Sequence, residues 1–332
     1  MHPVLLLLLT AQLPSATLRG TVTSVESGQP LGFSIVTLEP NGGRQFTDGA
    51  GTFVFSSAAP GRYVLSVRQI GYAPLDTQIV IQGDSATIVR IALRHLAVEL
   101  PPITITAQAA CTQPGRPDRN VDPALAAVFD QLVENAHRLD LLDEAHQVRL
   151  RIARTVREVT WRGDSLPVTA ETIEFDRRDM RRPYRPGNIV APGWGPFRDL
   201  TVVTLASLHE LGDSVFHRTH CFQLAGRDTI AGETLVRIDF APAQRVTSPD
   251  IAGSAYLDST TYRLRFTVTT LTRPERSGIR GIRTLVARTS FRDIISGVAV
   301  QDDMRAVTTF GFGPAASRIE TQRTIAATLA KD

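Results

Sequence analysis

Two histidines and a cysteine lie close together in the segment His217-Arg218-Thr219-His220-Cys221. Imidazole nitrogens and a thiolate are good zinc ligands, so this segment is a candidate metal site. The flanking Val215, Phe216 and Phe222 favour a strand, in which the two histidines point to opposite faces. On a helix they could converge instead. No Cys-x-x-Cys or His-Glu-x-x-His motif supports the site, so we predict no metal and a structural role for Cys221.

A second candidate chemistry is nucleophilic catalysis. Gly163-Asp164-Ser165 matches the serine block of one lipase family, but the same tripeptide recurs at 83–85 and 212–214. All three copies lie between strand-like runs, which predicts three turns. No Gly-x-Ser-x-Gly elbow occurs in the sequence. We therefore expect no catalytic residue, no cofactor and no enzymatic activity.

Arginines are concentrated in 149–157 and again in 177–182. Guanidinium groups bind phosphate and carboxylate, so these arginines could contact lipid headgroups. Acidic residues are interleaved with them, which favours a solvated face of a sheet instead. These acids are Glu158, Glu171, Glu174, Asp176 and Asp179.

A long loop rich in proline and glycine carries Tyr184, Trp194 and Phe197. Loops carry function, and aromatic side chains anchor interfaces, so these three residues are the candidate ligand or partner contacts. The alternative is a lid that packs over a sheet.

The two cysteines, Cys111 and Cys221, allow one pairing. In an oxidising compartment an even count favours a disulfide, which would close a loop of about 110 residues. Two unrelated buried thiols remain the alternative.

Composition and the first residues indicate where the protein acts. The chain is 42% hydrophobic with a net charge of +3, which is typical of globular domains and argues against disorder or nucleic-acid binding. Residues 1–16 contain an apolar run that ends in small residues, which predicts a signal peptide; a buried strand is the alternative. No later stretch has the roughly 18 apolar residues of a membrane span. We expect an exported protein, periplasmic or extracellular, without a membrane span.

The first half reads as strands cut by turns every 8–12 residues, as a β-sandwich requires. It resembles the carboxypeptidase regulatory-like domain, a transthyretin-like Greek-key sandwich also grouped with carbohydrate-binding-like folds. The resemblance covers residues 17–107 and implies a fold without a peptidase site. Five ordered motifs carry it: Gly20-Thr21-Val22, Gly28-Gln29-Pro30-Leu31, Thr47-Asp48 with Gly51-Thr52-Phe53, Pro60-Gly61-Arg62-Tyr63 and Ile70-Gly71-Tyr72.

Residues 108–122 read as a linker because prolines and glycine gather there. Just before it, 102–107 resembles the segment that leads into the plug of TonB-dependent receptors. A last strand of the sandwich is the reading that we favour for this segment.

The remainder, 123–332, is predicted as an α+β domain. Asp122-Pro123 starts a helix, and apolar residues at helical spacing form one stripe from Leu125 to Leu139. Later segments alternate apolar and polar residues, which predicts antiparallel strands with one wet face. The fold class is thus mainly β, with one main helix against a curved sheet. The hairpin 253–266 resembles one from the half-barrels that carry lipoproteins across the periplasm.

Several functions are compatible with these observations. We expect a non-enzymatic binding or scaffolding protein of the bacterial cell envelope, similar to uncharacterised secreted proteins with the same first domain. Its partner would be an envelope protein, a glycan or a lipid. One alternative is a carrier for an apolar ligand, with a cavity lined by Leu264, Phe266 and Val268. Another is an accessory protein of an outer-membrane TonB-type system.

Overall fold

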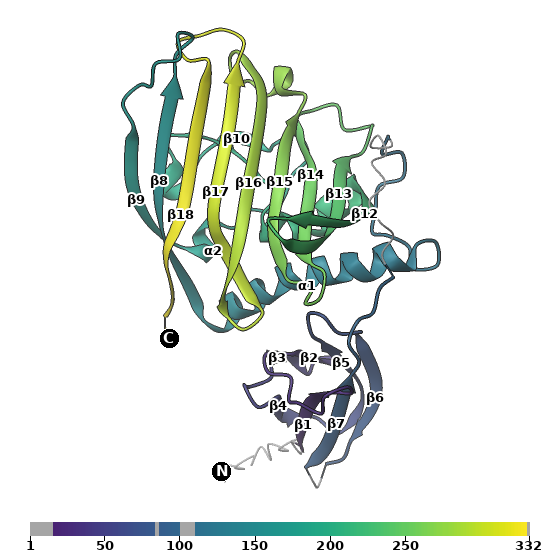
Figure 1. The fold of residues 1–332 in the computed structure, drawn as a ribbon. Coiled ribbons are helices and arrows are strands. Elements are labelled where there is room, and N and C mark those ends of the chain that lie inside the picture. The colour runs from purple at the N-terminus through teal and green to yellow at the C-terminus, as the bar shows by residue number, and fades with distance from the viewer. Residues whose placement is uncertain (1–15, 84–85, 100–109, 331–332) are drawn as a thin grey trace, which may run out of the picture. The chain divides into compact units, whose positions relative to one another are not determined.

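The computed structural model describes residues 16–83, 86–99 and 110–330, which divide into two compact units at Leu96. Unit 1 consists of strands in two sheets (Figure 1). A three-stranded sheet has the order β4-β1-β7, and a four-stranded sheet has the order β3-β2-β5-β6. The strands are β1 (Ala16–Ser24), β2 (Ile35–Glu39), β3 (Gly43–Phe46), β4 (Thr52–Ala58), β5 (Gly61–Arg68), β6 (Leu75–Ile81) and β7 (Thr87–Leu93).

Alternating apolar residues hold the two sheets of unit 1 together. Leu18, Leu38 and Leu65 are each almost fully buried in one core cluster. Gly51, in one of the motifs found in the sequence, has a φ of +73°, and a Cβ there would lie 2.5 Å from the Val22 carbonyl oxygen. Glycine is therefore required at that turn. The predicted β-sandwich is confirmed.

The ends of unit 1 leave two predictions open. Of the expected signal peptide, 1–16, the described residues include Ala16 alone, which pairs with Ala58 at the start of β1. The segment 102–107 lies outside the described residues, so neither reading of it is tested. Residues 110–122 precede the main helix without a strand or a helix.

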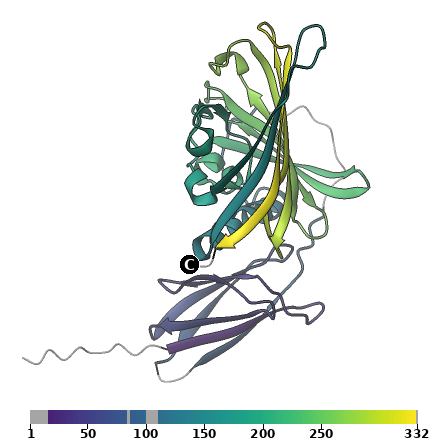
Figure 2. The same cartoon turned by 90° about the vertical axis from the view of Figure 1, so that its left-hand side faces the viewer.

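Unit 2 is built on one nine-stranded antiparallel sheet of order β12-β13-β14-β15-β16-β17-β18-β8-β9. Its strands are β8 (Gln147–Val159), β9 (Thr169–Asp176), β12 (His220–Ile230), β13 (Glu233–Pro242), β14 (Asp250–Asp258), β15 (Leu264–Thr272), β16 (Ile282–Ile295), β17 (Val298–Phe310) and β18 (Ser317–Ala330). The sheet is strongly curved, and the helices lie on its concave side (Figure 2). The predicted mainly β class, with one main helix against a curved antiparallel sheet, is confirmed.

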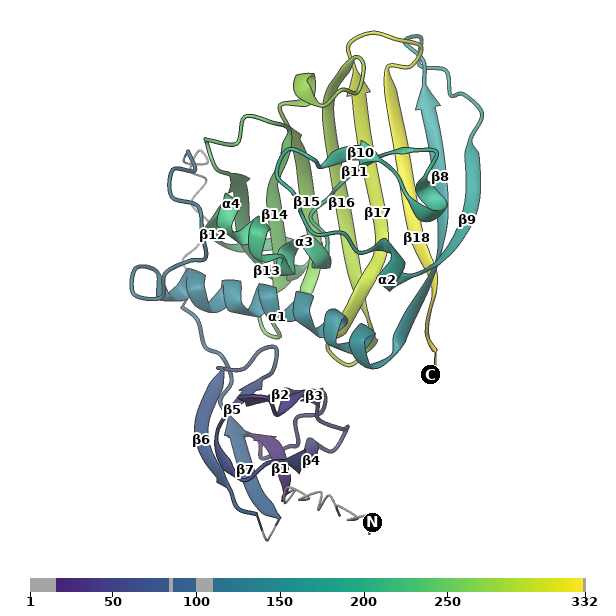
Figure 3. The same ribbon diagram turned by 180° about the vertical axis from the view of Figure 1, so that it is seen from behind.

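Apart from the short 3-10 helix in the connection from β15 to β16, the shorter elements of unit 2 lie on the same side of the sheet as the main helix α1 (Pro123–Ala145), as Figure 3 shows. None of the helices in the described part of the chain is long and apolar enough to cross a membrane. The shorter elements are α2 (Arg177–Met180), β10 (Val190–Pro192), η1 (Gly195–Phe197), β11 (Thr201–Val203), α3 (Leu208–Gly212), α4 (Ser214–Thr219) and η2 (Pro274–Arg276).

Helix α1 begins and packs as its sequence predicts. The Asp122 side chain accepts a hydrogen bond from the Leu125 N–H, and Pro123 occupies the first turn. The expected apolar stripe is buried against the sheet. Two polar side chains add contacts that the stripe does not reveal. Asn135 bonds to backbone groups of Tyr262 and Leu264, and Arg138 donates to the Gly297 carbonyl at 2.8 Å. Charged and amide groups on α1 therefore also fix the turns at one end of the sheet.

The expected disulfide is present between Cys111 and Cys221, whose Cα atoms are 5.5 Å apart. Cys221 lies in β12, and the Cys111 carbonyl accepts a hydrogen bond from the Gln244 N–H just after β13. The disulfide therefore fixes the segment before α1 to the β12 edge of the sheet.

Replacing both cysteines by serine is expected to lower the free energy of unfolding by about 3–5 kcal/mol, because the bond restricts a long loop of the unfolded chain. Urea unfolding of the variant and of the wild type measures this difference. Wild type unfolded with a reducing agent is the control and should match the variant. An unchanged midpoint in both would contradict the prediction.

Candidate functional site

Residues 181–206, here called the flap, cross the concave face of the sheet between α2 and α3 (Figure 3). Their strands β10 and β11 pair as a short antiparallel ribbon, with Ala191 opposite Val202. Prolines interrupt longer secondary structure in this segment. At Gly193 a Cβ would lie 1.9 Å from the Phe197 carbonyl oxygen, so glycine alone permits this reversal. The flap is an ordered ribbon over the sheet.

Both ends of the flap are bonded to the sheet. At its start, the buried Tyr184 hydroxyl donates a hydrogen bond of 2.5 Å to Asp250 on β14. At its end, the Ala206 N–H donates to the Thr269 hydroxyl at 3.2 Å, and Thr267 donates to the Ala206 carbonyl at 2.8 Å. Side chains of β14 and β15 therefore hold the flap in place.

Asp250 is the part of this anchor whose burial is most costly. It is fully buried, and its Oδ2 has no hydrogen-bond partner among the described residues. Burial raises the pKa of the Asp250 carboxyl, while the Tyr184 hydroxyl lowers it. His220 lies 3.6 Å away, and burial lowers the pKa of its imidazole. Tyr184, Asp250 and His220 are each at most 3% exposed, so their polar atoms form an internal anchor of the flap.

Two adjoining cavities lie between the flap and the sheet. The larger has a volume of about 720 Å³ and is bounded by the inner faces of β8, β16, β17 and β18. The smaller has a volume of about 450 Å³ and extends toward α3 and the end of α1. Both volumes are in the range of small-molecule sites. The cavities have a common wall, which includes Met180, Ala191, Trp194, Val202, Thr204, Ser207, Glu210 and Gln301.

The larger cavity has two unlike sides. One group of lining side chains is apolar: Met180, Phe197, Leu200, Leu285, Met304 and Phe310. The sheet also contributes a polar strip centred on Arg154, which donates to Glu320 at 2.7 Å and to Glu171 at 2.6 Å. Gln322 donates to Glu320 at 3.0 Å. Such a space suits a molecule that has both apolar and polar parts.

The second arginine-rich segment does not form the solvated sheet face that we expected. Arg177 is buried and bonds to Asp140 and Asp143 of α1, at 2.8 and 3.2 Å. Arg181 lies 3.2 Å from Asp140. Helix α2 brings these guanidinium groups to the end of α1, whereas Arg149 does remain exposed on β8. Buried ion pairs therefore fix the start of the flap.

The three aromatic residues singled out in the sequence all belong to the flap. Tyr184 lines the smaller cavity with its ring but uses its hydroxyl internally. Trp194 is half-buried in the common wall, and the Arg182 guanidinium lies 3.8 Å above its ring. Phe197 lines the larger cavity and meets Phe175 edge-on. The predicted lid over the sheet and the predicted loop of ligand contacts are therefore one segment, the flap.

The prediction that Leu264, Phe266 and Val268 of β15 line a cavity was wrong. A register shift at Tyr256 and Leu257 places Leu264 inward, against Asn135 of α1. Phe266 and Val268 lie on the opposite, outer face, where Phe266 stacks on Tyr256. The bulge reverses the alternation after Leu264. A prediction that assumes strict alternation of side chains along a strand could not detect this bulge.

The predictions for the chemical motifs had mixed outcomes. Residues 214–219 form helix α4 instead of a strand, because Asp213 caps it by accepting from the N–H groups of Val215 and Phe216. The copy at 163–165 is a turn, and Asp84 and Ser85 lie outside the described residues. Among the residues that the structure describes, no three His, Cys, Asp or Glu side chains gather as metal ligands.

Comparison with known proteins places the first unit. Residues 17–94 match the family model of the carboxypeptidase regulatory-like domain, so unit 1 is a domain of that family. No curated protein matches the sequence.

Solved structures resemble parts of the chain. The minor pilin GBS52 of Streptococcus agalactiae is 20% identical, covering 27% of this chain and 47% of the pilin, with a TM-score of 0.22. A DUF1329 family protein from Desulfovibrio piger is 11% identical over 60% of this chain and 92% of that protein, with a TM-score of 0.33. A LolA superfamily protein from Nitrosomonas europaea is 10% identical over 61% and 94%, with a TM-score of 0.30. The chain spans less than half of the pilin's length, so the pilin's role is not transferred.

Replacing Tyr184 by phenylalanine is expected to lower the free energy of unfolding by about 1–3 kcal/mol, because a buried carboxyl loses its donor. Since folding raises the pKa of Asp250, the contribution of this carboxyl to stability falls as the pH rises from about 4. Losing the hydroxyl raises that pKa further, so the penalty grows with pH. Urea unfolding at pH 4.5 and pH 8 measures both effects.

Tyr256→Phe is the matched control, because the Tyr256 ring stacks on Phe266 at the outer face of the sheet. It should change stability little and equally at both pH values. A Tyr184→Phe penalty that shrinks with rising pH would contradict the anchor role.

Proposed function

We propose that the chain is a non-catalytic binding protein that works outside the cytoplasm and holds an amphiphilic small molecule in unit 2. The observation that carries this proposal is the pair of adjoining cavities under the flap. The ligand's apolar part would lie beside Met180, Phe197 and Met304. The transfer of apolar surface from water would then drive binding.

The buried residues support binding over catalysis. The buried network of Tyr184, Asp250 and His220, in which burial shifts the pKa of each group, anchors the flap to the sheet. In the cavities, Glu210 is engaged by Ser207 in a capping box, and Arg154 is engaged by two glutamates. Because these groups are hydrogen-bonded within the protein, they act as fixed parts of the cavity walls.

An oxidising compartment is supported by the disulfide, since such bonds persist in secreted and periplasmic proteins. Unit 1, as a carboxypeptidase regulatory-like domain, adds a second folded unit to the same chain. A carrier that delivers its ligand within the cell envelope is the specific form of this function that we favour.

Binding of the uncharged probe N-phenylnaphthylamine tests the proposal. Thr308 lines the larger cavity, and a Thr308→Trp side chain would fill part of that space. We expect about a tenfold or greater loss of probe affinity, measured by fluorescence titration.

Val307→Trp is the matched control, because Val307 immediately precedes Thr308 on β17 and points to the outer face, opposite Val286. Its probe affinity should equal that of the wild type. A wild-type protein that does not bind the probe, or an equal loss in both variants, would refute binding in this cavity. Native mass spectrometry of the purified protein then identifies any ligand that it retains.

A further inference from the structure

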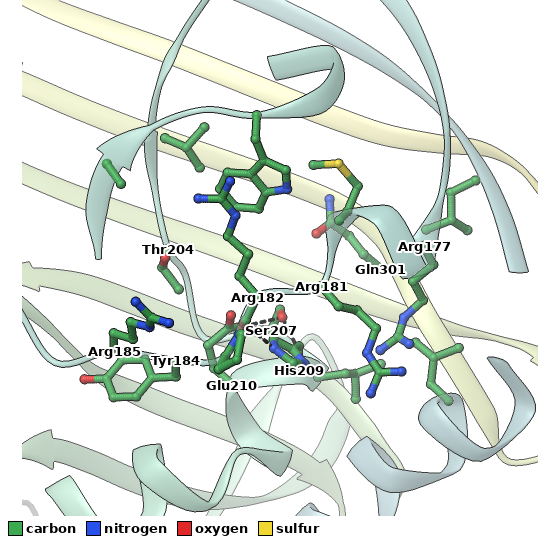
Figure 4. Close-up of a pocket in the computed structure, with 18 of the residues that line it drawn as sticks. Arg177, Arg181, Arg182, Tyr184, Arg185, Thr204, Ser207, His209, Glu210 and Gln301 are labelled. Carbon is green, nitrogen blue, oxygen red and sulfur yellow. Dashed lines mark hydrogen bonds between the residues drawn. The ribbon is translucent and has the colours of Figure 1, made fainter. Parts of the chain in front are cut away.

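The smaller cavity is cationic as well as concave. The charged side chains that line it include four arginines, Arg177, Arg181, Arg182 and Arg185, and one glutamate, Glu210. Figure 4 shows these groups arranged around the space beneath the flap. A concave site with an excess of one charge attracts groups of the opposite charge.

Two of these arginines are neutralised within the protein and two are not. Arg177 and Arg181 form ion pairs with Asp140 and Asp143. Among the described residues, neither Arg182 nor Arg185 has a carboxylate within ion-pair distance, and both are exposed on the flap at the cavity wall. Their guanidinium groups are therefore available to an anion from outside the chain.

Arg182 is also held in a defined orientation. Its guanidinium carbon lies 3.8 Å from the centre of the Trp194 ring, and its carbonyl lies 2.5 Å from the His209 Nε2. Stacking on indole covers one face of the guanidinium and leaves the N–H donors in its plane free. A planar fork of donors matches the oxygens of a carboxylate or a phosphate.

Two further polar atoms in the same cavity wall lack partners. The Trp194 Nε1 and the His209 Nδ1 are buried, and neither has a hydrogen-bond partner among the described residues. A buried donor such as an indole N–H is costly when it is left unbonded. An oxygen-rich group bound in the smaller cavity would supply an acceptor for this donor.

We propose that the smaller cavity receives the oxyanion head, a carboxylate or a phosphate, of an amphiphile whose apolar part occupies the larger cavity. The common wall at Trp194 places the two parts of one molecule side by side. This inference rests on the proposed binding function and names the chemical class of the ligand. Arg182 and Arg185 select the charged head, and the Trp194 N–H adds a donor.

The chain offers a direct reporter of this site. It has two tryptophans, and Trp161 is exposed on a turn with its N–H bonded to the Gly313 carbonyl. The full-length Trp161→Phe variant therefore leaves Trp194 as the sole tryptophan. Its fluorescence is titrated at pH 8 with dodecanoate, dodecyl phosphate, dodecan-1-ol and inorganic phosphate.

We expect dodecanoate or dodecyl phosphate to bind about tenfold or more tightly than the uncharged alcohol. Comparing the two anions shows which head the site prefers. Adding Arg182→Gln and Arg185→Gln should bring the affinity for the anions down to that for the alcohol and leave the alcohol's affinity unchanged. The matched control is Arg198→Gln, because Arg198 is on the same flap and its side chain is 80% exposed. This control should keep the preference.

Distinct results separate the two proposals. Equal binding of alcohol and anions by the starting variant, or a preference that survives loss of both arginines, overturns the head-group assignment and leaves the binding function intact. Inorganic phosphate that binds as tightly as dodecyl phosphate overturns the amphiphile and leaves an anion site. Failure of every compound to bind overturns the proposed function itself. Circular dichroism of each variant checks that the fold is retained.

Discussion

A curved sheet with strands this long has more inner face than one helix can cover. The strands β8, β16, β17 and β18 have 13 or 14 residues each and are about 45 Å long. An α-helix with its side chains is about 10–12 Å wide. Helix α1 crosses the sheet near one end, where Asn135 bonds to the turn at Tyr262 and Arg138 to the turn at Gly297. The rest of the concave face needs another cover.

The flap supplies that cover without filling the space beneath it. It is fixed at its ends, by Tyr184 on Asp250 and by Ala206 on two threonines of β15. Between these anchors its short ribbon spans the strands and leaves the two cavities. A buried carboxyl with one unbonded oxygen is a costly anchor, and here it holds the start of the flap on the sheet.

Turn and cap motifs in the sequence predicted much of this fold. Most of the features that the sequence did not predict depend on contacts between distant segments. The turn motifs around Gly51 and the cap at Asp122 act within a few residues, so the sandwich and the start of α1 could be predicted. The face on which Phe266 lies depends on a bulge set by its neighbouring strand. The partners of Arg177 are on α1, more than 30 residues earlier. The exception is local: the tripeptide 212–214 predicts a turn, whereas the Asp213 side chain caps α4.

The polar strip of the larger cavity limits what can lie against it. A dry hydrocarbon packed over the Arg154–Glu320 pair would remove the remaining water contact of the Glu320 carboxylate, which its attraction to the already buried Arg154 offsets only in part. Apolar parts of a ligand are therefore directed toward Met180, Phe197 and Met304, while water or ligand hydroxyls remain over the strip. Together with the arginines of the flap, the two cavities therefore offer an apolar, a polar and a cationic environment. A molecule with one chemistry throughout would satisfy at most one of them, which favours an amphiphile over a simple hydrocarbon or a simple anion.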